Sequence, residues 1–218
     1  MFAPRGHTIG ILDYGVGNLY SIQKALREFT NNVLITDDPE KIKELDGLIL
    51  PGVGSFGAGM DGLHRRGLIK EVKNFAKSGK PMLGICLGAQ IMLSKGYEFG
   101  EFKGLDIIPG RVVIFPKLKG GAKIPNIGWS EFYYKKGFSP NKTIFDSVGK
   151  NSDAYFVHSF VLEPKNKDHV ATLTDYGGYT FCSAIRKDNI YGCQFHPEKS
   201  GPIGLKIIEN FVKLTKIK

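Results

Sequence analysis

A single cysteine, Cys86, stands in the stretch GICLGAQ, with Gly84 two residues before it and Gly88 two residues after it. This G-x-C-x-G spacing is typical of a nucleophile elbow, a sharp turn from strand to helix that lifts a side chain out of a sheet and needs small neighbours. A thiol there would face the N–H groups that begin a helix, which favour the thiolate. The N–H of Leu87 could stabilise an oxyanion on a substrate carbonyl. The spacing predicts a reactive cysteine, whereas the plainer alternative is a small buried side chain.

A reactive cysteine needs a base, and His196 in YGCQFHPE is the favoured candidate. It ends an apolar run, where α/β sheets hold their chemistry. Because side chains i and i+2 of an extended segment point the same way, the Glu198 carboxylate can hydrogen-bond one imidazole nitrogen and leave the other for Cys86. His158, inside the alternating run YFVHSF, is the rival base but is better interpreted as a hydrogen-bonded strand residue. Side chains without evident catalytic partners are His7, His64 and His169, and the other two cysteines, Cys182 and Cys193, are interpreted as packing residues.

The glycine-rich stretch PGVGSFG contains Gly52, Gly54 and Gly57 in a G-x-G-x-x-G spacing after an apolar run. In dinucleotide-binding turns of this spacing, an acidic residue about twenty positions later holds the ribose. Lys77 and Ser78 stand in that region here, which disfavours a dinucleotide site. The turn is better interpreted as backbone N–H groups that converge on an oxyanion.

The first half of the chain alternates apolar runs with amphipathic segments. Strands are predicted in TIGILDY, NVLIT, GLILP and KPMLGIC, and helices in NLYSIQKALREF behind the cap Asn18, in DPEKIKEL with Pro39 in its first turn, and in GLIKEVKNFAKSG. This order predicts a parallel sheet with helices on both faces.

From about Arg111 the pattern changes to alternating runs that predict further strands: RVVIF, AYFVHSFVLE, HVATLTDY and YTFCSAIRKDNIYGCQFHP. They should pair as a meander added to one side of the parallel sheet. The last segment, GPIGLKIIENFVKLTK, has a helical apolar stripe and should pack back on the sheet. No linker or repeat is evident, so residues 1–218 are predicted to form one domain. The predicted fold class is α/β, an open and mostly parallel sheet flanked by helices, with antiparallel strands added in the second half.

The composition limits the classes of function. No apolar run approaches the roughly 18 residues of a membrane span, and the amino terminus lacks the apolar centre of a secretion signal, so we expect a cytoplasmic protein with no membrane partner. The three cysteines form no C-x-x-C pair and lie at no metal-ligand spacing from a histidine, which indicates reduced thiols and neither metal nor cofactor. The formal net charge is +9, but basic residues are scattered without interleaved aromatic residues, which disfavours a nucleic-acid partner. A solvated basic surface and a docking face for an acidic protein both stay open.

Taken together, GICLGAQ and HPE resemble the motifs of the class I (triad) glutamine amidotransferases. The resemblance is closest to one branch, the glutaminase subunits of imidazole glycerol phosphate synthase (the HisH family). Blocks similar to that branch occur in order along nearly the whole chain: ILDYGVGNLYSIQKAL, LILPGVGSFGAGM, GKPMLGICLGAQIML, IPNIGWSE, YFVHSF and GCQFHPEKSG. The resemblance implies a flavodoxin-like fold and glutaminase activity.

It also implies roles for single residues. Cys86 would be the nucleophile, His196 the base and acid, and Glu198 the carboxylate that orients it. The thiolate would attack the carboxamide of L-glutamine, His196 would protonate the departing ammonia, and water would hydrolyse the glutamyl thioester. The implied substrate-binding positions, which include the oxyanion-hole amides and the glutamine that holds the amino-acid end of the substrate, are Gly52, Val53, Leu87, Gln90, His158, Ser159 and Phe160.

The resemblance implies a partner as well, a (β/α)8-barrel cyclase that forms a heterodimer with the glutaminase. That cyclase would use the ammonia to make imidazole glycerol phosphate and AICAR in histidine biosynthesis. Trp129, Tyr155 and Lys199 match family positions near the docking face.

Three departures from the family pattern keep alternatives open. Asn126 and Ser130 stand in PNIGWS where the family more often has PHMGWN, and Phe160 stands where it has tyrosine. A paralogous glutaminase that feeds a barrel partner in amidation of a bacterial surface sugar fits the same motifs. A cysteine hydrolase such as a peptidase, or a non-catalytic module, would share the fold, but Gln90 and the PGVG turn favour glutamine, and the intact triad favours catalysis.

Overall fold

The computed structural model describes residues 7–216, so the first six residues, on which the expected lack of a secretion signal partly rests, lie outside the described range. At the centre of the described residues lie neighbouring parallel strands in the order β2 (Val33–Thr36), β1 (Ile9–Leu12), β3 (Gly47–Leu50), β4 (Met82–Ile85) and β13 (Ile190–Cys193). The first four are the strands predicted from the first half of the chain. β13 belongs to the predicted meander, yet it runs parallel to β4 with Cys193 opposite Ile85. That register brings the segments that leave these two strands side by side at one edge of the sheet.

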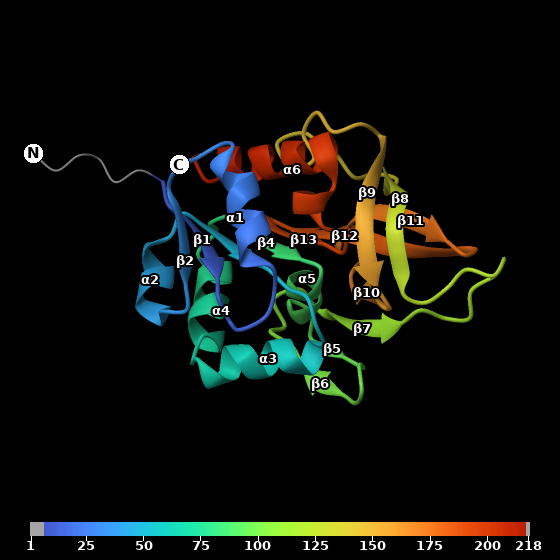
Figure 1. The fold of residues 1–218 in the computed structure, drawn as a ribbon, viewed down its shortest axis with the longest axis horizontal. Helices are drawn as coiled ribbons and strands as arrows, with labels where there is room; N and C mark the ends of the chain where they lie inside the picture. The colour runs from blue at the N-terminus through green and yellow to red at the C-terminus, as the bar shows by residue number, and fades with distance from the viewer. Residues whose placement is uncertain (1–6, 217–218) are drawn as a thin grey trace, which may run out of the picture.

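Beyond β13 the sheet continues mainly with antiparallel strands from the second half of the chain, as expected, and ends in two short strands from residues 95–103. The continuation runs through β12 (Tyr179–Lys187), β10 (Phe160–Pro164), β7 (Gly110–Ile114), β5 (Lys95–Gly96) and β6 (Phe102–Lys103). A branch leaves β12 through β11 (Val170–Tyr176) to β8 (Asn126–Tyr134) and β9 (Asn151–His158), which stand together on the right of Figure 1.

Helices cover both faces of the parallel strands, which confirms the predicted open α/β sheet (Figure 1). One face packs under α1 (Leu19–Arg27) and α6 (Gly201–Leu214), and the other under α2 (Pro39–Glu44), α3 (Phe56–Arg65), α4 (Ile69–Lys77) and the short α5 (Leu87–Ile91). The predicted cap of α1 is present, since the Asn18 side chain accepts the N–H of Ser21 at 3.2 Å. Asp38 caps α2 ahead of Pro39, which lies in the first turn as predicted. Single 3₁₀ turns lie at Lys167–His169 and Pro197–Lys199.

The helix α3 was not predicted, because its glycines lower helix propensity by about 1 kcal/mol each relative to alanine. Tertiary packing explains them. A Cβ on Gly62 would lie 2.1 Å from the carbonyl oxygen of Tyr14, and one on Gly59 would lie 3.2 Å from the Leu87 side chain. Close approach of the helix to its neighbours therefore outweighs local propensity here.

The prediction of one strand in AYFVHSFVLE was wrong. The run divides at Ser159 into β9, which pairs with β8, and β10, which pairs with β7 and β12. The His158 ring hydrogen-bonds the carbonyl oxygen of Phe160 at 2.8 Å, so the chain bends where the strand would have continued. The strand β8 was not predicted, although the block IPNIGWSE of the family resemblance overlaps it.

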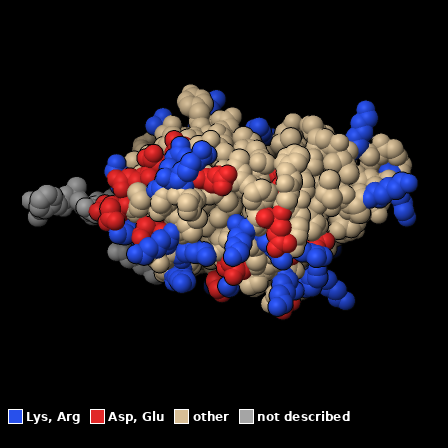
Figure 2. Space-filling model, turned by 90° about the horizontal axis from the view of Figure 1, so that it is seen from below, with Lys and Arg blue, Asp and Glu red and all other residues tan. Residues whose placement is uncertain are grey.

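No helix within residues 7–216 is long and apolar enough to cross a bilayer. On the face drawn in Figure 2, lysine and arginine side chains are interspersed with acidic ones, without a continuous basic stripe. That distribution agrees with the scattered basic residues of the sequence and offers no track for a nucleic-acid backbone on this face.

Candidate active site

Cys86 occupies the sharp turn between β4 and α5, with φ +52° and ψ −109°. Its N–H donates to the carbonyl of Cys193 at 2.7 Å, which ties the turn to the end of β13. The flanking glycines are required for space: a Cβ on Gly84 would lie 2.7 Å from the backbone of Gly88, and one on Gly88 would lie 1.9 Å from the carbonyl oxygen of Leu50. The structure thus has the geometry expected of a nucleophile elbow.

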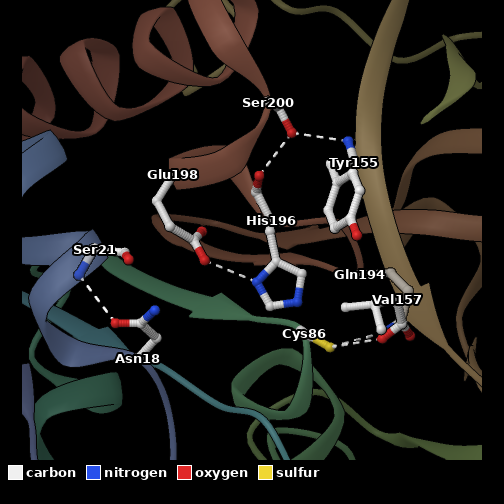
Figure 3. A network of polar contacts seen from close by, with 9 residues as sticks. All are labelled: Asn18, Ser21, Cys86, Tyr155, Val157, Gln194, His196, Glu198 and Ser200. Carbon is white, nitrogen blue, oxygen red and sulfur yellow. Dashed lines mark hydrogen bonds and ion pairs between the residues drawn. The ribbon is translucent and has the colours of Figure 1, made fainter. Parts of the chain in front are cut away.

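The imidazole of His196 points toward Cys86, and the Glu198 carboxylate lies behind it (Figure 3). Nδ1 of His196 and Oε1 of Glu198 are 2.8 Å apart, and both side chains are only 2% exposed. Nε2 of His196 is buried and makes no hydrogen bond to the described residues. Burial by itself lowers the pKa of His196, but the Cys86 sulfur and the Glu198 carboxylate outweigh it and raise this pKa to about 9. The ring is therefore protonated at neutral pH and complements a thiolate.

The backbone of His196 is fixed by its neighbours. Its N–H donates to the carbonyl of Tyr155 at 2.9 Å. The hydroxyl of Ser200, which is buried, donates to the carbonyl of His196 at 2.6 Å and accepts the N–H of Tyr155 at 3.0 Å (Figure 3). Strand β9 and the turn that carries the imidazole are thereby joined.

A pocket of about 250 Å³ opens beside Cys86. This volume is below the roughly 300–1,000 Å³ of most ligand sites, which suits a single amino acid better than a larger ligand. Its lining consists of Val53, Gly54, Cys86, Gln90, Glu98, Pro125, Val157, His158, Ser159 and Phe160. A larger hollow of about 590 Å³ lies at the opposite edge of the sheet, where lysines and apolar side chains line it and no cysteine is present. Because the smaller pocket contains the candidate nucleophile, it is the candidate active site.

Gln90, to which the family resemblance implies a substrate-binding role, extends from α5 into this pocket. Its Nε2 donates to the carbonyl of Phe160 at 3.3 Å and to Oε1 of Gln194 at 3.2 Å. Both bonds use the amide nitrogen, so the side-chain oxygen of Gln90 is left as an acceptor for a ligand.

The predicted oxyanion turn packs directly on the elbow. A Cβ on Gly52 would lie 2.6 Å from Cβ of Leu87 and 2.8 Å from the backbone nitrogen of Gly88, while Val53 lines the pocket and is 43% exposed. The buried hydroxyl of Tyr14 donates to the carbonyl of Pro51, immediately before this turn. Burial and the nearby Cys86 raise the pKa of Tyr14, which keeps its phenol protonated as a donor.

Two polar residues of the site were not predicted. Glu98, between β5 and β6, lines the pocket and accepts the N–H of Phe56 at 2.7 Å through one carboxylate oxygen. Gln194 is fully buried, and its Nε2 lies 3.7 Å from the Cys86 sulfur. Gln194 could have been predicted from the sequence. It stands two residues before His196, and in an extended segment side chains at that spacing lie on the same face. No sequence spacing singles out Glu98.

The rival base, His158, is a hydrogen-bonded residue at the end of β9. Burial lowers its pKa to about 4, with a smaller contribution in the same direction from His196, so the ring is neutral. Nδ1 faces the carbonyl of Phe160 at 2.8 Å, and Nε2 faces the Asn126 amide at 3.4 Å. It shapes the pocket wall together with Ser159 and Phe160, and it is not aimed at the thiol by any hydrogen bond.

The remaining candidates lie apart from the pocket or at its rim. Cys182 and Cys193 are buried, and burial raises the pKa of each thiol, that of Cys182 to about 12. Trp129 is 58% exposed and contacts the Tyr155 ring edge to face at 6.2 Å, next to the exposed Lys199 turn. Among residues 7–216 no cluster of histidine, cysteine or acidic side chains could hold a metal ion.

Comparison with known proteins agrees with this arrangement. The sequence model of the family "Glutamine amidotransferase class-I" matches residues 10–214. The chain is 46% identical over 211 residues to "Imidazole glycerol phosphate synthase subunit HisH 1" of Legionella pneumophila strain Paris, a match that covers 95% of this chain and 99% of that protein. It is 44% identical over 213 residues to "Imidazole glycerol phosphate synthase subunit HisH" of Sulfurimonas denitrificans, with coverage of 96% and 100%.

Solved structures share the fold at lower sequence identity. A putative GMP synthase subunit from Thermoplasma acidophilum superposes with a TM-score of 0.70 at 22% identity, covering 98% of this chain and 96% of that one. A structure described as a glutamine amidotransferase superposes with a TM-score of 0.72 at 16% identity, covering 96% and 100%.

Proposed function

Because the chain belongs to the class-I glutamine amidotransferase family, we propose that it hydrolyses glutamine to glutamate and ammonia and passes the ammonia to a separate synthase subunit. One observation carries the chemistry: a buried imidazole, oriented by a carboxylate at 2.8 Å, faces the cysteine of a strand-to-helix elbow beside an amino-acid-sized pocket. The family match over residues 10–214 also supports one domain for the chain.

In the proposed mechanism, the Cys86 thiolate attacks the side-chain carbonyl carbon of glutamine. The oxyanion that forms accepts hydrogen bonds from the backbone N–H groups of Leu87 and of the Gly52–Val53 turn. Protonated His196 gives its proton to the departing ammonia and then takes one from the water that hydrolyses the thioester. Glu198 holds the ring in the tautomer and orientation that both steps need.

The far end of the pocket suits the amino-acid end of the substrate. The Gln90 oxygen and the Glu98 carboxylate, one of whose oxygens is bound to Phe56, provide acceptors for the α-ammonium group. The backbone of Ser159 and Phe160 closes the side opposite the elbow. These groups favour an α-amino acid over a peptide segment, which counts against a peptidase.

The proposed partner is a (β/α)8-barrel cyclase of histidine biosynthesis, which the motif resemblance implies; the naming of the relatives as one subunit of imidazole glycerol phosphate synthase supports a separate partner subunit. Exposed apolar side chains near the pocket mouth support docking there: Val53, Ile127 and Trp129 are 43%, 61% and 58% exposed. Ile127 pairs with the pocket residue Val157 across β8 and β9, which places this surface next to the thiol.

A specific observation keeps the sugar-amidating paralogue as the second candidate. Two of the three departures from the family pattern lie at the site, since Asn126 contacts His158 and Phe160 lines the pocket. In that second role the partner subunit would be different, while the glutaminase chemistry would be the same.

The test is glutamine hydrolysis by the purified chain, alone and with each barrel cyclase of the host, in the presence of a phosphoribulosyl ligand. Stimulation by the histidine-pathway cyclase supports the first role, and stimulation only by another barrel protein supports the second. Cys86→Ala should abolish hydrolysis and leave partner binding intact. Hydrolysis retained by this variant would refute the nucleophile assignment.

A further inference from the structure

The fully buried side chain of Gln194 bridges the nucleophile and the residue proposed to hold the substrate. Its backbone N–H donates to the carbonyl of Ser183 at 2.9 Å, which continues the pairing of β13 with β12 by one residue. Since Cys86 and Gln194 directly follow the paired ends of β4 and β13, the two residues lie beside each other. Nε2 of Gln194 is 3.7 Å from the Cys86 sulfur (Figure 3). Its Oε1 is 3.2 Å from Nε2 of Gln90.

The hydrogen-bond chain fixes which end of this amide faces the sulfur. The carbonyl of Phe160 can only accept, so the Gln90 atom at 3.3 Å from it must be the amide nitrogen. The same nitrogen faces Gln194 and therefore requires the oxygen of Gln194 as its acceptor. The amide nitrogen of Gln194 is thus left pointing at the Cys86 sulfur as a donor.

Two uncharged groups contact the sulfur and favour opposite protonation states. The carbonyl of Val157, at 3.8 Å, can accept from the S–H and so favours the thiol. The Gln194 N–H can only donate, so it favours the thiolate. The titratable groups that face this region are His196 and Glu198 from the 3₁₀ turn, His158 from β9, and Tyr14 from the loop after β1. Gln194 differs from all of them because a carboxamide carries no charge at any working pH.

We infer that Gln194 is a further catalytic residue of the proposed glutaminase reaction: its N–H stabilises the Cys86 thiolate, while its carbonyl holds Gln90 in position for the substrate. The inference rests on the proposed function for the role of Gln90. It gives the thiolate a second stabilising group besides the imidazolium of His196. Gln194 acts on the free thiolate, before it attacks glutamine and again when hydrolysis of the thioester releases it.

The experiment measures the rate of Cys86 alkylation by iodoacetamide as a function of pH, followed by mass spectrometry of the peptide that carries Cys86. In Gln194→Met the donor is lost at similar side-chain length, and the pH of half-maximal rate should rise by about one unit, so the rate at pH values well below the midpoint should fall roughly tenfold. Gln194→Glu keeps an acceptor for Gln90 and sets a carboxylate against the sulfur, so its midpoint should rise further.

Asn210→Leu is the matched control. Asn210 is buried in α6, and its Nδ2 donates to the carbonyls of Ile144 and Asp146 at 3.0 and 2.7 Å, away from the pocket. Like Gln194→Met, this variant replaces a buried amide that makes two hydrogen bonds. It should therefore lose stability, while its alkylation midpoint stays at the wild-type value.

An unchanged midpoint in folded Gln194→Met overturns the inference. If that variant fails to fold, Gln194→Glu decides, and a midpoint at or below the wild-type value overturns it. Alkylation requires no glutamine, so failure here is distinct from failure of the proposed function, which would appear as hydrolysis retained by Cys86→Ala.

Discussion

The imidazole of His196 stands between a sulfur and a carboxylate, and both stabilise its protonated form. Its pKa is raised from 6.5 to about 9. For a raised pKa the stabilisation of the protonated ring is complete below about 6.5 and is lost as the pH rises through 9. Glutamine hydrolysis that relies on this imidazolium should therefore persist to about pH 9 and decline above it.

Glu198→Gln tests this dependence. Loss of the carboxylate should lower the pKa of His196, so the alkaline decline of kcat/KM for glutamine should begin at lower pH. Turnover should fall by roughly 10²-fold without vanishing, because an orienting residue assists the reaction but does not form bonds to substrate. A pH profile and rate equal to wild type would remove Glu198 from the triad.

Among single residues, the sequence predicts those site residues that stand at a characteristic distance along the chain from another residue. Cys86 follows from the glycines on each side. Glu198 was predicted from its i+2 position after His196 and does contact the ring, but the extended backbone assumed for this pair was wrong, because Glu198 lies in the 3₁₀ turn Pro197–Lys199. Glu98 could not be found this way, because it reaches the pocket through the pairing of β5 with β6 and through its bond to the amino terminus of α3. Contacts between segments far apart in the sequence leave no local pattern.

Among the elements, the loop after β1 acts on the oxyanion turn from behind. Tyr14 anchors the Pro51 carbonyl, and a Cβ on Gly17 would lie 3.1 Å from the Pro51 side chain. Beyond Gly52 the turn is less constrained: Gly54 has φ +121° and no heavy atom within 4 Å of a Cβ placed there. The orientation of the Val53 amide therefore depends on the part of the turn that Tyr14 holds.

We predict that Tyr14→Phe lowers kcat for glutamine about tenfold while KM changes little, since direct loss of an oxyanion donor costs more, about 10² to 10³. Tyr134→Phe is the matched control, because the Tyr134 hydroxyl also donates to a backbone carbonyl, that of Val148 at 2.9 Å, far from the pocket. Both variants should lose about 1 kcal/mol of unfolding free energy. A kcat for Tyr14→Phe no lower than that of the control would contradict the prediction.

The elements differ in how far they could be predicted. Strands β1 to β4 and the helix α1 follow from apolar periodicity and a cap. The helix α3 does not, because its glycines are selected by contact with Tyr14 and Leu87 rather than by helix propensity. Strand β13 was expected from its apolar run, but its parallel pairing with β4 depends on the whole sheet.

For the whole molecule, the apolar surface at the pocket mouth predicts where the synthase partner docks. Large aromatic side chains at the centre of an interface carry much of its binding energy. Trp129→Ala should weaken the affinity for the cyclase by roughly 10- to 100-fold, as measured by titration calorimetry. Lys77→Ala, at the opposite edge of the sheet, is the control and should bind as wild type does. Equal affinities for the two variants would place the docking face elsewhere.

The turn at Cys86 has a thermodynamic consequence. A φ of +52° with ψ −109° is unfavourable for every residue with a Cβ, by about 1 to 3 kcal/mol, and is open to glycine. Glycine usually destabilises a folded protein relative to alanine, yet at this position the order should invert, with Cys86→Gly melting at a higher temperature than Cys86→Ala. Neither variant has the sulfur, so the comparison isolates the backbone. Such an inversion would mean that a side chain at position 86 costs fold stability. The inactive glycine variant would then have the more favourable backbone at this turn, and the nucleophile would be kept at the expense of stability.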